Sequence, residues 1–76
     1  MSGNSDMNVR FSDLCTFLES VGFERRVKGD HYIYFRYDIP EIINIQPQGS
    51  KAKAYQVKQI RLLLKKYGIW GDGRYV

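Results

Sequence analysis

The sequence predicts a small α+β domain in the order α-β-β-β-α, with a three-stranded antiparallel sheet and both helices on one face. Two observations support this fold class. Apolar residues recur at helical spacing near each end of the chain, and three short runs rich in β-branched and aromatic residues lie between them. Short turn signals separate these runs, as expected of a meander.

The first helix is predicted from four apolar residues. Phe11, Leu14, Leu18 and Val21 recur at steps of three and four, and Gly22 stands where a helix often ends. Cys15 lies beside this stripe, and we expect it to be a small buried residue rather than a nucleophile.

The three strands are predicted over "FERRV", "HYIYFRY" and "IINIQ". Strand residues alternate between the two faces of a sheet, so a face can be assigned to each position. Ile33 and Phe35 are expected to meet the core, as are the third strand's Ile43 and Ile45. The exposed face of the second strand is then expected to carry Tyr32, Tyr34 and Arg36.

The second helix is predicted from about residue 54 to residue 67, and Gly68 ends it. Its buried stripe comprises Val57, Ile60, Leu63, Leu64 and Tyr67, and a basic stripe on another face comprises Lys58, Arg61 and Lys65. The same element order occurs in double-stranded-RNA-binding domains. That likeness of architecture does not by itself fix the function.

The chain is expected to form one domain over residues 10–69, with a flexible N-terminal segment at 1–9 and a C-terminal tail at 70–76. Its 76 residues leave no room for a deep cofactor cleft. One cysteine excludes a disulfide framework within the chain. No apolar run is long enough to span a bilayer, so we expect a cytoplasmic protein with no membrane partner.

The charge is distributed unevenly along the chain. The formal net charge is +4, and six basic but no acidic residues lie between Ile42 and Gly71. This one-sided charge favours a polyanionic partner, although a solvated helix face is the simpler interpretation.

His31 is the single histidine, and it follows the predicted Gly29-Asp30 turn. A histidine can exchange a proton near neutral pH, and RNA carries its own nucleophile in the 2′-hydroxyl. Cations would bind the RNA backbone and offset its charge. The candidate RNA-binding residues are Arg25, Arg26, Lys28, Lys51, Lys53, Lys58 and Arg61.

The segment "GFERRVKGDHYIYF" resembles the signature of HicA-type toxins, in which Gly-Ser-His precedes an apolar strand. The later segment "EIINIQPQGSKAKAYQVKQIRLLLKKYGI" is similar to the C-terminal half of one subgroup. Asp30 stands where that signature has Ser, and the segment before Gly29 is one residue shorter. Which of Arg25 and Arg26 matches the family's basic position therefore stays open.

The resemblance implies a metal-independent endoribonuclease that cleaves mRNA with His31 as its catalytic residue and needs no cofactor. It also implies a HicB-type antitoxin that binds the toxin and shields the histidine. Two alternatives remain. The domain could be a non-catalytic RNA-binding module, or a protein-interaction domain that docks through its tyrosine-rich face and Trp70.

Overall fold

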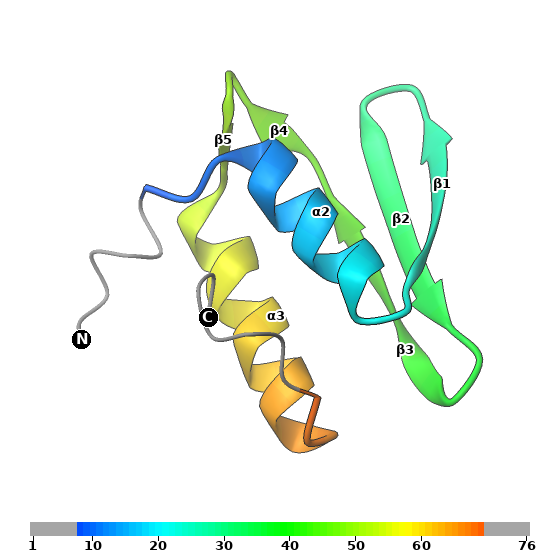
Figure 1. Ribbon diagram of the computed structural model, residues 1–76. Helices are drawn as coiled ribbons and strands as arrows, with labels where there is room; N and C mark the ends of the chain where they lie inside the picture. The colour runs from blue at the N-terminus through cyan, green and yellow to red at the C-terminus, as the bar shows by residue number, and fades with distance from the viewer. Residues whose placement is uncertain (1–7, 70–76) are drawn as a thin grey trace.

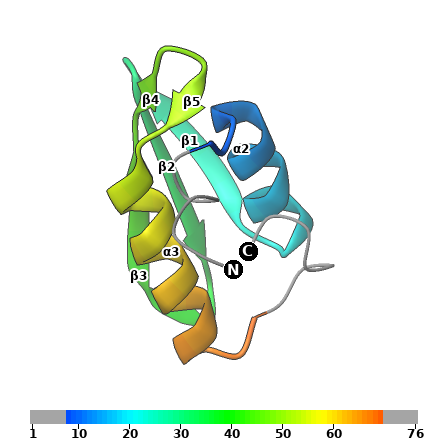
Figure 2. The same ribbon diagram turned by 90° about the vertical axis from the view of Figure 1, so that its left-hand side faces the viewer.

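The structure is a computed structural model and describes residues 8–69. A three-stranded antiparallel sheet lies between two helices in the chain, as the sequence predicts, and the helices pack on one of its faces (Figures 1 and 2). The elements are α2 (Phe11–Ser20), β1 (Glu24–Lys28), β2 (His31–Arg36), β3 (Ile39–Ile45), β4 (Pro47–Gln48), β5 (Lys51–Ala52) and α3 (Ala54–Lys66).

Helix α2 is fixed at its start by a distant part of the chain. The amide of Phe11 donates to the carbonyl of Ser50 at 3.0 Å, and the amide of Ala52 donates to the carbonyl of Val9 at 2.9 Å. Arg10 also forms a β-bridge with Lys51. We call this set of backbone contacts the clasp. It supplies a partner to an amide at the first turn of α2, where helices leave amides unpaired.

The turn between β1 and β2 is a two-residue connection. Lys28 pairs with His31 across it, and Gly29 has a φ of 63° while Asp30 has a negative φ. A positive φ at the first turn position alone is the pattern of a type II′ hairpin turn, which requires glycine there. The sequence Gly29-Asp30 therefore places His31 as the first residue of β2.

The predicted faces of β2 are wrong. Tyr34 is 0% exposed, and its side chain packs among the helices instead of facing solvent. Tyr34 pairs with Ile43 and Tyr32 with Ile45, so these four residues share the inner face. Both isoleucines are buried as expected. Because side chains alternate along a strand, Ile33 and Phe35 lie on the outer face.

Polar groups on the inner face have partners in α2 or in the residue that follows it. The hydroxyl of Tyr34 donates to Glu19 Oε2 at 3.0 Å, and burial raises the pKa of Tyr34. Tyr32 meets Phe11 edge-on, with ring centroids 4.9 Å apart. Arg36 donates to the carbonyl of Val21 at 2.7 Å. A tyrosine-rich surface for docking a partner therefore does not exist on β2.

Beyond β3 the chain forms a short hairpin that the sequence analysis missed. Strands β4 and β5 pair as a separate two-stranded sheet, and α3 begins directly after them. Val57, Ile60 and Leu64 of α3 are buried against the sheet, as its apolar spacing predicts. Leu63 and Tyr67 pack at the edge of this core and are partly buried.

The predicted segments at 1–9 and 70–76 fall almost entirely outside the described residues, as does Trp70. Asn8 and Val9 are described, and Val9 belongs to the clasp. Within residues 8–69, neither helix has the length and apolar character needed to cross a membrane.

Candidate functional site

His31 lies on the outer face of the sheet, at the end of β2 that adjoins the β1–β2 turn. Its side chain is 47% exposed, so one edge of the imidazole is open to solvent while the ring is held from the other side. The Nδ1 atom lies 3.0 Å from Oδ1 of Asn44. An amide oxygen only accepts hydrogen bonds, so Nδ1 carries the proton in this contact. In the neutral ring, Nε2 then holds the free lone pair.

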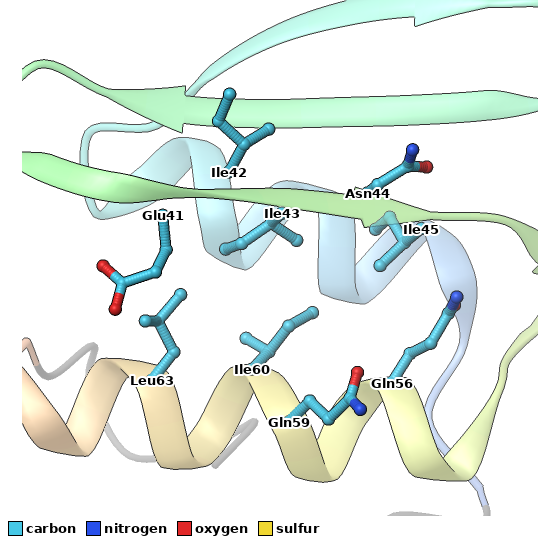
Figure 3. A pocket seen from close by; sticks show the side chains of 9 residues that line it. All are labelled: Glu41, Ile42, Ile43, Asn44, Ile45, Gln56, Gln59, Ile60 and Leu63. Carbon is cyan, nitrogen blue, oxygen red and sulfur yellow. The ribbon is translucent and has the colours of Figure 1, made fainter.

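Asn44 reaches His31 because of the register between β2 and β3. Asn44 is directly opposite Ile33, and His31 is two residues earlier on the same strand face. Such diagonal neighbours are within reach of one another across an antiparallel pair. In Figure 3, Asn44 and Ile42 point away from α3, whereas Ile43 and Ile45 point toward it. The sequence on β3 thus alternates between core residues and residues of the open face.

Asp30 is held by a second amide from the end of β3. Gln46 Nε2 donates to Asp30 Oδ2 at 3.1 Å, and the other carboxylate oxygen lies 3.9 Å from Nε2 of His31. Asn44 and Gln46 are two residues apart, so they contact the two consecutive residues Asp30 and His31 side by side. The carboxylate that replaces the signature serine is therefore fixed beside the imidazole.

The predicted basic residues of β1 divide between the two faces. Lys28 is opposite His31 and Arg26 is opposite Ile33, so both share the open face with the histidine. The Arg26 guanidinium lies over the Phe35 ring, 5.7 Å from its centroid. Arg25 is opposite Tyr34 and points to the helix side, where its Nη1 atom lies 3.7 Å from Oε2 of Glu19.

The other predicted cations belong to the β4–β5 hairpin and to the start and middle of α3. Lys51 and Lys53 follow the β4–β5 turn, at the same end of the molecule as the β1–β2 turn (Figures 1 and 2). Lys58 and Arg61 are on α3, which buries its apolar side against the inner face of the sheet. The helix layer therefore carries these two residues, and the sheet separates them from His31.

Two other candidate sites offer less chemistry. A groove of about 340 Å³ runs between β3 and α3 and is lined mainly by aliphatic and amide side chains (Figure 3). Its carboxylate, Glu41, is already bound by Lys66 and Tyr67. Cys15 is buried as predicted, and burial raises the pKa of its thiol, which disfavours the nucleophilic thiolate. Residues 8–69 contain no cluster of three potential metal-ligating side chains.

Sequence reasoning missed three residues of this site: Asn44, Gln46 and Phe35. A signal for the two amides was present, because both alternate with the inward isoleucines of the third strand. Phe35 was assigned to the core because aromatic residues are usually buried.

A comparison with protein-family models matches residues 11–69 to the family described as HicA toxin of bacterial toxin–antitoxin. Comparisons with curated proteins and with solved structures give no significant match. The matched segment runs from the start of α2 to the last described residue, and it includes the β1–β2 turn, His31 and both amides that hold the turn. The chain belongs to the HicA toxin family.

Proposed function

We propose that this toxin is a metal-independent endoribonuclease that cleaves mRNA, with His31 as its general acid–base. The contact between His31 Nδ1 and Asn44 is the observation that carries the proposal. It orients a half-exposed imidazole and leaves Nε2 able to accept a proton from a substrate.

The reaction would use the nucleophile that RNA itself provides. His31 Nε2 removes the proton from a 2′-hydroxyl, and the 2′-oxygen attacks the adjacent phosphorus. The bond from phosphorus to the 5′-oxygen breaks, and that oxygen takes a proton from water, which the open site admits. The products are a 2′,3′-cyclic phosphate and a 5′-hydroxyl. Lys28 is opposite His31, where its charge would offset the charge developing on the phosphate.

The partner that the family implies fits the same site. Membership in a toxin–antitoxin family implies an antitoxin partner for this chain. We propose that it is a HicB-type protein and that it covers His31. Acidic groups of that protein would pair with Lys28 and Arg26, so antitoxin and RNA would compete for one surface.

The deciding experiment compares wild type, His31→Ala and His31→Gln for cleavage of mRNA in vitro, with thorough removal of metal by EDTA. Wild type should cleave with or without EDTA and yield cyclic-phosphate ends, and DNA of the same sequence should resist. Loss of the general acid–base should lower the rate by roughly 10²–10⁴-fold. Circular dichroism and the melting temperature should match wild type, because His31 lies outside the core.

Two outcomes would oppose this assignment. Cleavage that EDTA stops and Mg²⁺ restores would replace the mechanism with a metal-dependent one. RNA binding without any cleavage, unchanged in both His31 variants, would favour the non-catalytic RNA-binding module.

A further inference from the structure

We propose that the open face of the sheet binds a single strand of RNA, with one unpaired base stacked on the Arg26–Phe35 pair and the reacting phosphate between His31 and Lys28. This inference rests on the proposed function, because it assigns a substrate class and a second binding position to the same site. Sequence signatures do not point to it, since Phe35 reads as a core residue.

The geometry of β2 sets the direction of the strand. His31, Ile33 and Phe35 are successive outward residues, and four residues of β-strand span about 13 Å. The register places Lys28 opposite His31, Arg26 opposite Ile33 and Glu24 opposite Phe35. A chain that enters at His31 therefore passes over Ile33 and reaches Phe35 in a straight path.

The Arg26–Phe35 pair forms a stacking platform. Its separation of 5.7 Å between guanidinium carbon and ring centroid is within the range of a cation–π contact. Phe35 is partly buried and supports the guanidinium from below, while Arg26 is exposed. Guanidinium planes and aromatic rings are the surfaces on which proteins stack splayed RNA bases. Only an unpaired base offers a free face, so the platform selects a single strand over a duplex.

The charges of the open face favour an anionic occupant near the histidine. Arg26 and Lys28 are the cations there. The facing carboxylates are Glu24, which is opposite Phe35 at the far end, and Asp30, which Gln46 holds in place. Phosphates can therefore lie along Lys28 and Arg26 without meeting Glu24, and these two cations offset the repulsion from Asp30 beside the imidazole. An acidic protein would also fit the cations, but it would not require a planar group on Phe35.

The test measures binding of 2′-O-methyl RNA, which lacks the 2′-hydroxyl nucleophile and so cannot be cleaved by this route. A short strand and its duplex are titrated against wild type, Arg26→Lys and Phe35→Leu. A 2-aminopurine base in the strand reports stacking through the loss of its fluorescence. Lys65→Gln is the matched control, since Lys65 is an exposed cation on α3.

Wild type should bind the single strand more tightly than the duplex and quench the 2-aminopurine. Arg26→Lys keeps the charge but loses the plane, and it should weaken single-strand binding by about fivefold or more, the lower limit for losing one stacked base. Its salt dependence should stay the same. Phe35→Leu should show the same loss, and Lys65→Gln should retain both the preference for the single strand and the quenching.

Three results would overturn the inference. Wild type could bind the duplex as tightly as the single strand, or Arg26→Lys could quench the 2-aminopurine as much as wild type does. Third, Arg26→Lys and Phe35→Leu could bind RNA as wild type does but lose binding to the antitoxin. The third would make the open face a protein-docking surface. Failure of the proposed function looks different, because wild type would then leave unmodified RNA intact whatever the binding data show. Should Phe35→Leu fail to fold, the exposed Arg26→Lys variant decides alone.

Discussion

The two faces of strand β2 carry similar residues but have different roles. The inner face holds Tyr34, which is fully buried and hydrogen-bonded to Glu19 of α2. The outer face holds His31, Ile33 and Phe35, and no described element covers it (Figures 1 and 2). The comparison teaches that the aromatic residues resembling a binding surface hold the fold together, while the groups capable of chemistry lie where packing leaves them accessible.

The difference between the two faces is best tested by truncating one side chain on each face to alanine. Tyr34→Ala should lower the free energy of unfolding by about 3–5 kcal/mol, because it opens a cavity among both helices and the sheet. Ile33→Ala, one residue along and on the open face, should cost clearly less. Urea unfolding of both variants measures this. Equal losses would mean that the open face is covered in solution.

Salt dependence sharpens the comparison between the sheet face and the helix layer. Lys28→Ala should reduce the slope of log affinity against log salt by about 0.7 for a short single strand, since one phosphate contact is lost. Lys58→Ala should leave that slope unchanged for the short strand and reduce it only for RNA long enough to reach α3. The measurement is a series of titrations with uncleavable RNA at several salt concentrations. If Lys58→Ala reduced the salt slope for the short strand more than Lys28→Ala does, the RNA would bind along the helices instead of the open face.

The smallest expected effect concerns Glu41, which connects β3 to the end of α3. Hydrogen bonds from Tyr67 and then Lys66 hold its pKa below the ordinary value of 4.5. The carboxylate therefore contributes stability that is complete above that pH and is lost as the pH falls through the lowered pKa. Glu41→Gln should destabilise the protein at neutral pH and differ less from wild type in acid.

Thermal unfolding of Glu41→Gln between neutral pH and pH values below 4.5 checks this, with Tyr67→Phe as the control that removes the larger of the two contacts. A difference from wild type that stays constant across this range would show that the carboxylate charge does not contribute.

The element order and the inward isoleucines of β3 could be predicted because each depends on local spacing in the sequence. The faces of β2 could not. Both alternating sets in "HYIYFRY" are strand formers, so the choice depends on what α2 supplies. Glu19 accepts the hydrogen bond of Tyr34 from fifteen residues away. Phe11 meets Tyr32 from twenty-one residues away, and neither contact can be read from the strand sequence itself.

The candidate site, like the fold, could be predicted only in part from the sequence. His31 and its glycine turn are adjacent in the sequence, so their proximity follows from the hairpin. Asn44 joins them only through the β2–β3 register, which includes an irregularity between Tyr34 and Arg36. Local patterns predict that the two strands pair, but the residue that meets His31 depends on the register that tertiary packing selects.

The clasp has a consequence for the order in which the chain acquires its structure. Helix α2 is synthesised before the sheet, yet the hydrogen bonds at its start need Ser50 and Ala52, about forty residues later. Closing a loop of that size costs about 3 kcal/mol of chain entropy. Closing each two-residue turn of the sheet costs much less. On a ribosome, which releases the chain from its N-terminus, the residues that form the His31 site emerge before the helix beneath them can be secured. The start of α2 therefore gains these partners only after the residues of the His31 site have been synthesised.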